Sequence, residues 1–299
     1  MERIRKKTEG PAAPINQQTM RQKLRLYKKN PLSLILFLLV CLAALLTVCV
    51  IVFLLGYILI NGIPNLSWDL FSLQYTSENV SLLPAMLNTI IMTLLSLLMA
   101  APLGIFSAIY LVEYAKRGNK LVEVIRVTAE TLSGVPSIVY GLFGSLFFVT
   151  TMHLGYSLLS GAFTLTIMIL PLIMRTTEEA LKAVPDSYRE GSFGLGAGRL
   201  RTVFRIVLPS AVPGILAGVI LAVGRIVGET AALIYTAGTV ADWPQNLLSS
   251  GRTLSVHMYV LSNEALYMRQ AYATAVVLLV IVVGINAIAG FIAKRIAKG

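Results

Sequence analysis

Apolar residues fill six long runs of this chain, and polar residues are concentrated between them. The runs are Leu32–Ile60, Leu82–Val112, Val124–Thr150, Ser160–Met174, Ser210–Tyr235 and Ala271–Ala293. Most exceed the roughly 18 residues that mark a candidate membrane-spanning helix. A hydrocarbon layer offers the backbone no hydrogen-bond partners, and the runs lack the alternation of β-barrel strands. The pattern predicts an all-α polytopic membrane protein with six transmembrane helices.

Lysine and arginine are unevenly distributed over the segments that connect the runs. The segments after the first and third runs have none, and the segment before the sixth has only Arg252 and Arg269. The other segments hold Lys116, Arg117, Lys120 and Arg126, then Arg175, Lys182, Arg189, Arg199, Arg201 and Arg205, and finally Lys294, Arg295 and Lys298. Cytoplasmic segments of membrane proteins carry such an excess. The alternation predicts that both termini are cytoplasmic, and it explains the net charge of +11 without a nucleic-acid patch.

Two regions are expected: a basic cytoplasmic tail over residues 1–30, and one six-helix transmembrane domain over residues 31–299. The tail either docks on anionic lipid or is a solvated orientation signal, and it lacks the features of a removable signal peptide.

Cys41 and Cys49 lie in the first run, eight residues apart. That spacing is roughly 12 Å along a helix, which is too long for a disulfide.

Two ionisable residues, Arg225 and Glu229, lie inside the fifth apolar run. Each charge at the centre of a membrane helix costs roughly 2.5–3.5 kcal/mol, so neither is expected to face lipid. A spacing of four places both on one helical face. They form either a structural ion pair or part of a pathway, in which Arg225 faces the solute and Glu229 holds or competes for it. Guanidinium groups suit oxyanions because they donate two parallel hydrogen bonds.

Proline and glycine interrupt the third and fifth runs. Pro136 follows "TLSG", and the break either exposes backbone groups toward a pathway, with Ser133 and Ser137 as added donors, or is a kink repaired by neighbouring groups. In the fifth run, the pairs Gly214/Gly218 and Gly224/Gly228 have the spacing of close helix contacts. Those contacts are expected either within this chain or with a partner.

The cytoplasmic segment between the fourth and fifth runs, about residues 175–209, contains "EGSFGLGAGRLRTVFRIVLP". Its glycines do not form a phosphate-binding loop, because no strand precedes them and no Gly-Lys-Ser/Thr follows. We predict a short helix, a turn permitted by Gly194, Gly196 and Gly198, a second helix, and a proline at the entry to the membrane. Such a hairpin suits docking into a groove on another protein.

The residues of this segment have a spacing that resembles that of the "EAA" loop of ABC-importer permeases. The matching residues are Glu190, Gly191, Ser192, Gly196, Ile206, Leu208 and Pro209. Gly191 and Ser192 replace the two alanines of the family pattern, a mild departure because all four residues are small. The resemblance implies a type I ABC-importer permease architecture, in which this loop forms a coupling helix that fits a cleft of a cytoplasmic ATPase.

Two further stretches, "GVPSIVYGLFG" from residue 134 and "GRIVGETAALIYTAG" from residue 224, resemble the permeases of phosphate-specific importers. "RTTEEAL" and "GETAAL" are closer to the PstA type than to its partner, the PstC type. The resemblance extends from about Leu82 to the C-terminus. It implies pathway roles for Arg225 and Glu229, and it matches Arg175 to another family arginine, for which an interfacial anchor is the alternative.

This resemblance implies a permease subunit that forms half of a translocation pathway in an ATP-driven phosphate importer of the cytoplasmic (inner) membrane. The implied partners are a PstC-like permease, two copies of a PstB-like ABC ATPase, an external PstS-like binding protein and membrane lipid, without nucleic acid. The chain itself is expected to have no catalytic residue, metal or cofactor, because ATP and Mg would be bound by the ATPases.

Two other functions are weighed against this one. An intramembrane enzyme would need acidic, serine–histidine or metal-binding groups within the spans. The candidate aspartates and histidines are instead expected in loops; they are Asp69, Asp186, Asp242, His153 and His257. The second alternative is a permease of the same architecture for another oxyanion or polar nutrient, or the PstC-type partner. Only the phosphate-type stretches and the intramembrane arginine speak against another cargo, and "RTTEEAL" and "GETAAL" speak against the PstC type.

Overall fold

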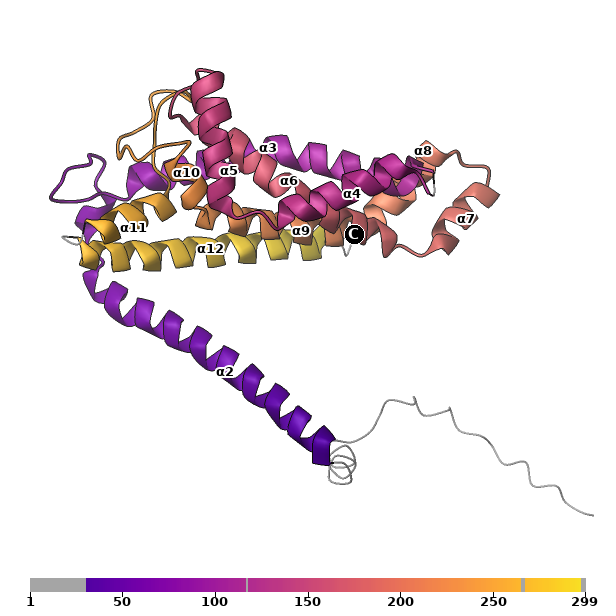
Figure 1. Ribbon diagram of the computed structural model, residues 1–299, viewed down its shortest axis with the longest axis horizontal. Helices are drawn as coiled ribbons and strands as arrows, with labels where there is room; N and C mark the ends of the chain where they lie inside the picture. Colours follow the sequence, from indigo (N-terminus) through magenta and orange to yellow (C-terminus); the bar gives the residue numbers. More distant parts are fainter. Residues whose placement is uncertain (1–30, 117, 265–266, 297–299) are drawn as a thin grey trace, which may run out of the picture. The chain divides into compact units, whose positions relative to one another are not determined.

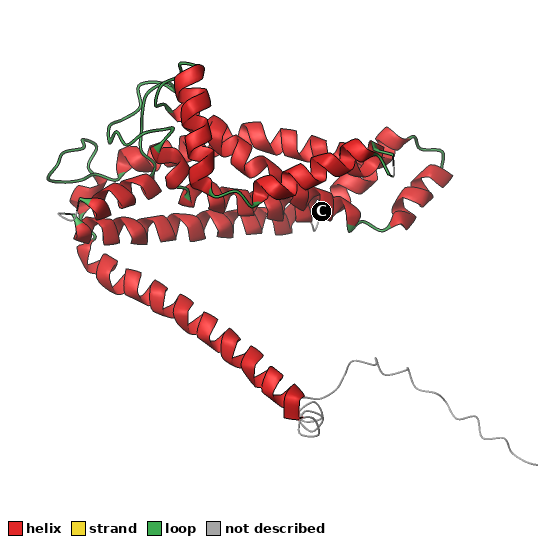
Figure 2. Ribbon diagram, in the orientation of Figure 1, coloured by secondary structure: helices red, strands yellow, loops and turns green. Residues whose placement is uncertain are grey.

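The computed structural model describes residues 31–116, 118–264 and 267–296, and within these ranges the regular structure is entirely helical (Figures 1 and 2). The α-helices are α2 (Pro31–Gly62), α3 (Leu83–Ile109), α4 (Lys120–Ser133), α5 (Ser137–Gly144), α6 (Leu158–Lys182), α7 (Asp186–Gly194), α8 (Arg199–Thr202), α9 (Leu208–Gly228), α10 (Ala231–Ile234), α11 (Leu254–Asn263) and α12 (Met268–Ile296). Short 3₁₀ segments are η1 (Ile63–Asn65) and η2 (Trp68–Phe71), and π-helical segments are η3 (Tyr110–Tyr114), η4 (Ser145–Thr151) and η5 (Val203–Val207).

Five helical stretches of the described chain are long and apolar enough to cross a membrane. They are Leu32–Asn65, Leu83–Tyr114, Leu158–Lys182, Arg199–Gly228 and Met268–Phe291. A sixth candidate is the pair formed by residues 120–133 and 137–151, which is bent by 102° at its break. The prediction of six spans is therefore confirmed when this pair counts as one span, and the third span is sharply broken.

The chain divides into two compact units, residues 1–57 and 58–299. In the first unit, α2 is apolar on all sides and carries no charged residue. Such a helix is stable only in a lipid or protein environment. Cys41 and Cys49 are free and exposed, as expected. The predicted basic tail, residues 1–30, lies outside the described residues.

The core of the second unit is formed by α3, α6 and α9, which pack through fully buried side chains such as Met92, Ile169 and Ile226. Small residues allow close approach. A Cβ atom at Gly214 would lie 2.7 Å from Cβ of Ala180, and one at Gly218 would collide with Thr176. The first glycine pair therefore packs α9 against α6 within this chain.

The second glycine pair behaves differently, because a Cβ atom added at Gly224 or Gly228 would have no neighbouring atom within 4 Å. Both glycines lie near the end of α9 that carries Arg225. Their spacing thus creates a narrow, open strip of helix surface rather than a contact inside the chain.

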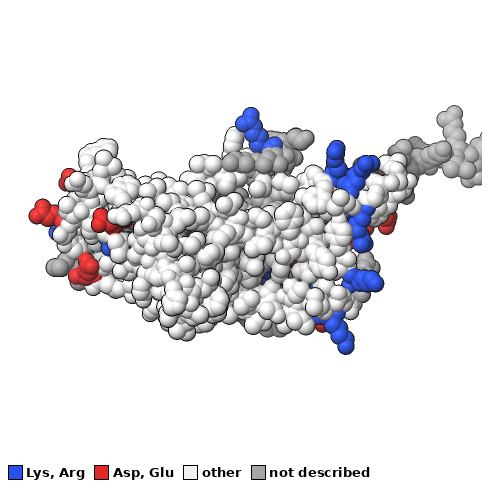
Figure 3. Space-filling view, turned by 90° about the horizontal axis from the view of Figure 1, so that it is seen from above, with Lys and Arg blue, Asp and Glu red and all other residues white. Residues whose placement is uncertain are grey.

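Charged side chains separate toward the two ends of the helical bundle (Figure 3). Lysine and arginine gather at the end that carries α7 and α8, whereas acidic side chains dominate the other end. The exposed acidic residues in the loops of that other end are Asp69, Glu78, Asp242 and Glu264. This separation agrees with the predicted orientation, in which the end with α7 and α8 is cytoplasmic.

One of the histidines expected in loops, His257, instead lies fully buried in α11. Burial, together with the positive charge of Arg252, lowers the pKa of His257 to about 3. The guanidinium carbon of Arg252 lies 5.0 Å from the ring centroid of Tyr75. The side chain of Asn88 also donates to the Arg252 carbonyl oxygen at 3.2 Å. At neutral pH the imidazole of His257 is therefore uncharged.

The contact between Gly218 and Thr176 predicts a difference between two alanine variants. Gly218→Ala should destabilise the chain by about 1–3 kcal/mol, because the new methyl group forces α9 away from α6. Gly224→Ala meets open space and should be neutral or stabilising by up to about 1 kcal/mol. Thermal unfolding of both purified variants in detergent checks the difference, and equal melting temperatures would contradict the packing.

Candidate functional site

The third and fifth spans are both broken, and their breaks lie against each other. α4 and α5 meet at 102° around Pro136, and α9 ends at Gly228 before the short helix α10. A Cβ atom at Gly141 of α5 would lie 2.8 Å from Cα of Ala232 in α10. Discontinuous helices within a membrane expose polar backbone and therefore occur where protein or a solute path surrounds them.

The break between α4 and α5 is closed by local hydrogen bonds. The Val135 N–H donates to the Leu132 carbonyl at 3.0 Å, and the Tyr140 hydroxyl donates to the same oxygen at 2.8 Å. These bonds favour the interpretation of a kink repaired by its neighbours over one that frees backbone groups. Ser133 and Ser137 are half-buried on the two sides of the break.

Glu229 acts as a cap at the second break. It follows the last residue of α9 with extended backbone angles (φ −71°, ψ 129°), and its side chain accepts a hydrogen bond from the Ala232 N–H at 3.0 Å. The Ser255 hydroxyl of α11 donates to the Glu229 carbonyl at 2.6 Å. A buried carboxylate at the start of α10 satisfies a backbone donor that would otherwise lack a partner.

The expectation that Arg225 and Glu229 share one helical face is therefore wrong, since α9 ends between them. Among the ion pairs of the described residues, none joins the two side chains. Arg225 is half-buried in the last turn of α9, where the helix dipole favours a cation. It lies three residues before the end of α9, next to the second break.

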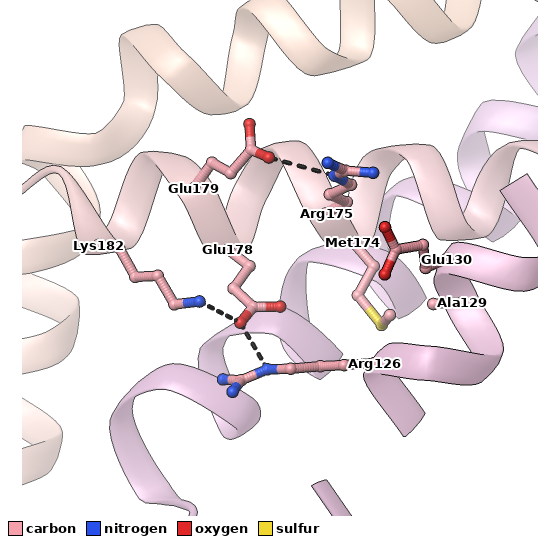
Figure 4. Close-up of a pocket in the computed structure, with 8 residues that line it drawn as sticks. All are labelled: Arg126, Ala129, Glu130, Met174, Arg175, Glu178, Glu179 and Lys182. Atoms are coloured by element: carbon pink, nitrogen blue, oxygen red, sulfur yellow. Dashed lines mark hydrogen bonds and ion pairs between the residues drawn. The ribbon is translucent and has the colours of Figure 1, made fainter. Parts of the chain in front are cut away.

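Arg175 lies apart from this region, at a cavity of about 190 Å³ between α4 and α6 that is lined mainly by charged residues (Figure 4). Its Nε atom is 3.2 Å from Oε1 of Glu179. In the same cavity, the buried carboxylate of Glu178 binds two cations, with Arg126 Nε at 2.7 Å and Lys182 Nζ at 2.6 Å. The cavity also contains Glu130. The sequence analysis missed Glu178, because its partner Arg126 is distant along the chain.

The two arginines lie at different depths of the bundle. Thr176, the neighbour of Arg175, meets Gly218 on α9, and Arg225 lies seven residues farther along that helix. Seven residues correspond to about 10 Å along the helix axis. The structure thus separates Arg225 from Arg175 instead of bringing both into one binding site.

The predicted helix–turn–helix of the cytoplasmic segment is confirmed by α7, the turn at residues 195–198, and α8 (Figure 1). Of Gly194, Gly196 and Gly198, only Gly196 has a left-handed backbone conformation (φ +83°), whereas Gly198 has φ −72°. Only Gly196 thus requires glycine for its conformation. The hydroxyls of Ser192 and Thr202 are buried and 2.8 Å apart, which ties α7 to α8.

The residues assigned to ATPase coupling divide into a tip and a base. Glu190, Gly191 and Gly196 are exposed at the hairpin tip, and Pro209 is exposed at the first turn of α9. At the base, Ile206 and Leu208 are half-buried, and Leu208 packs against the apolar cluster at the cytoplasmic end. Because α8, η5 and α9 form one continuous helical stretch, Arg199–Gly228, the hairpin is joined directly to the helix that carries Arg225.

Exposed apolar side chains, which the sequence analysis did not single out, surround the hairpin tip. Leu195 is 91% exposed, and the others are Tyr188, Phe193 and Leu200. Exposed apolar side chains of this kind are typical of protein-docking surfaces. Within the part of the chain that the structure describes, no cluster of His, Cys, Asp and Glu side chains could hold a metal ion.

Comparison with known proteins identifies the family of this arrangement. A family model described as "Binding-protein-dependent transport system inner membrane component" matches residues 100–298. The chain is 35% identical to the probable ABC transporter permease protein YqgI of Bacillus subtilis (strain 168) over 240 residues, which cover 75% of this chain and 81% of YqgI. It is 40% identical over 212 residues to the phosphate transport system permease protein PstA of Pasteurella multocida (strain Pm70), covering 70% and 74% of the two chains.

Solved structures share the fold at low sequence identity. A chain of a bacterial alginate ABC transporter aligns with a TM-score of 0.68 and 16% identity, covering 92% of this chain and 99% of that one. A chain of the MetNI methionine ABC transporter in an inward facing conformation aligns with a TM-score of 0.57 and 18% identity, covering 72% and 94%. These likenesses establish the fold of an ABC importer permease.

The cap formed by Glu229 predicts different effects of two substitutions. Glu229→Gln keeps a side-chain oxygen for the Ala232 N–H and should preserve stability, whereas Glu229→Ala should cost about 1–2 kcal/mol. Thermal unfolding of the two purified variants measures this. If Gln were as damaging as Ala, the negative charge rather than the cap would be the role of Glu229.

Proposed function

The chain belongs to the family of binding-protein-dependent transport system inner membrane components, and on this basis we propose that it imports phosphate as the permease subunit of an ATP-driven transporter. Members of this family are multi-pass membrane subunits of transporters and not enzymes. The observation that carries the cargo assignment is the identity, 32–40% over most of the chain, to proteins named phosphate transport system permease protein PstA. The same identity supports the PstA-type position over the PstC-type one.

The chemistry of Arg225 supports an anionic solute. A guanidinium group can donate two hydrogen bonds to a phosphate oxyanion, and this one has no carboxylate partner among the described ion pairs. It also lies where two helices are broken. A transit path must release its ion, so it cannot bind phosphate tightly. The weak binding that a single arginine provides is therefore enough for passage.

The fold by itself does not decide the cargo, because solved relatives with this fold are named for alginate and for methionine. Another oxyanion or a polar nutrient therefore remains the second candidate. Arg225 favours an anion among these solutes. A direct comparison of solutes in the assembled transporter separates the candidates.

ATP hydrolysis would take place in two cytoplasmic ABC ATPases, which bind ATP and Mg, while this chain pairs with a second permease in the cytoplasmic membrane. A binding protein would deliver phosphate from outside. The exposed tip around Leu195 supports docking to the ATPase, and the continuous helix from Arg199 to Gly228 connects that tip to Arg225. Movement of the hairpin would thus bias the pathway between outward- and inward-facing states.

The assembly is tested by purifying the tagged chain from its native membranes in mild detergent and identifying the associated proteins by mass spectrometry. We expect an ABC ATPase, a second permease and a phosphate-binding protein. A different binding protein would keep the mechanism and change the cargo. A chain that purifies alone even after crosslinking would overturn the proposal.

Arg225→Gln should reduce phosphate uptake by the reconstituted transporter at least tenfold, since it removes the charge along the path, while the complex still assembles. Arg225→Lys keeps the charge but loses the two-pronged donor, and its uptake should be intermediate. Uptake of labelled phosphate and gel filtration of the complex measure the two effects. Unchanged uptake by Arg225→Gln would contradict the pathway role and indicate that Arg225 is structural.

Leu195→Asp should weaken ATPase binding at least tenfold, because it places a charge on the apolar tip that docks into the ATPase cleft. The stability of the chain itself should not change, since this side chain is 91% exposed. Trp68→Asp is a matched control, with 91% exposure at the opposite end of the bundle. Co-purification of the ATPase is the measurement, and equal recovery with both variants would rule out docking through the tip.

A further inference from the structure

We propose that Arg189 is a positioning residue that clamps the coupling helix α7 to the cytoplasmic ends of α3 and α6, so that displacement of α7 moves both spans. The proposal rests on the proposed function, because it concerns how the permease receives movement from the ATPase. It adds a specific side chain, next to Glu190 in sequence, through which that movement passes.

The first half of the clamp joins α7 to the end of the second span. Arg189 Nη2 donates to Glu113 Oε1 at 2.7 Å, and Nε donates to Oε1 at 3.1 Å and to Oε2 at 3.4 Å. The two side chains are 15% and 9% exposed. Glu113 belongs to η3, the π-helical turn that follows α3. Charge-assisted, two-pronged bonds of this kind fix orientation as well as distance.

The second half joins α7 to the end of α6. Arg189 Nη1 donates to the Val184 carbonyl at 2.8 Å, and Nη2 donates to the Leu181 carbonyl at 2.9 Å. The Leu181 carbonyl also accepts the Val184 N–H at 3.3 Å, and Val184 lies two residues beyond the end of α6, so the guanidinium adds donors to the C-terminal end of this helix. Asp186 Oδ1 accepts a further bond from Nη1 at 3.2 Å. One guanidinium therefore binds three segments of the chain.

The position of the clamp explains why it matters for movement. Between α6 and α7 the chain passes through Pro185, whose extended backbone (φ −57°, ψ 139°) breaks the helix. In this proposal the break is the hinge between the two helices. Without a cross-link over this hinge, a push on α7 would only change the angle at the proline. With Arg189 bound to both sides of the hinge and to Glu113, α7, α6 and α3 move together.

Among the other ion pairs of the described residues, only Arg126–Glu178 joins two elements, α4 and α6, and it does not involve the hairpin. Arg175 and Glu179 are both exposed and lie on the same helix, so their pair links no two elements. Lysine in place of Arg189 would keep the charge but could not reach the carboxylate and both carbonyls at once, because the N–H donors of an ammonium group all share one nitrogen atom. The clamp therefore predicts that arginine itself is required.

The test uses the complete transporter with its ATPase and binding protein, reconstituted in proteoliposomes, and measures labelled phosphate taken up per ATP hydrolysed. Arg189→Lys and Glu113→Gln should each lower this ratio at least tenfold while ATP hydrolysis continues and the ATPase still co-purifies. Glu123→Gln, an exposed carboxylate on α4 at the same end, is the matched control and should keep the wild-type ratio.

A double variant separates transmission of movement from stability. Replacing both residues by methionine, Arg189→Met with Glu113→Met, removes the two charges together and leaves neither one buried and unpaired. We expect this variant to regain the stability lost by single substitutions and to remain uncoupled. A wild-type ratio in the double variant would overturn the proposal, because the clamp would then be purely structural.

Failure of this inference is distinguishable from failure of the proposed function. If the wild-type complex itself takes up no phosphate or binds no ATPase, the proposed function is wrong. If the wild type couples hydrolysis to uptake and Arg189→Lys keeps the same ratio, the clamp alone is wrong. Loss of ATPase co-purification in the Arg189 variants would also contradict it, since Arg189 would then serve docking and not transmission.

Discussion

The fold depends on the cost of leaving a backbone or charged group unpaired inside a hydrocarbon layer. Each place where a span is interrupted carries a compensating bond: Tyr140 to a carbonyl before the first break, and Glu229 to a free N–H after the second. Charges that need water lie mainly at the two ends of the bundle (Figure 3). Arg225, in the last turn of α9, differs from these because it lies away from both ends. A charged residue within a membrane points to function.

A second consequence of the fold is mechanical. The coupling hairpin is not a loose loop, because one side continues into α9 as a single helix and the other side is bound through Arg189 to two further spans. The Ser192–Thr202 hydroxyl contact holds the two sides together. A rigid hairpin passes on displacement, whereas a flexible one would absorb it.

The local sequence pattern was sufficient to predict the spans and the coupling hairpin. Long apolar runs and the turn at Gly196 are determined by residues that are adjacent in the sequence. It did not predict the end of α9 at Gly228, since the sequence remains apolar up to Tyr235. The break after Gly228 is stabilised by the Glu229 side chain, which caps the start of α10, and by a bond to the Glu229 carbonyl from Ser255, 26 residues away. The pairing of Arg189 with Glu113 spans 76 residues and has no local signature. The exposure of Leu195 likewise appears only when the hairpin is folded.

The most direct test of the account is ATP-driven solute uptake by proteoliposomes that contain the complete transporter. Uptake of labelled phosphate, sulfate and methionine is compared, with and without ATP on the ATPase side and the binding protein on the other side. The account predicts uptake of phosphate alone, which requires both ATP and the binding protein. ATP-driven uptake of another solute without phosphate would contradict the cargo, and hydrolysis without uptake of any solute would contradict the role as an importer.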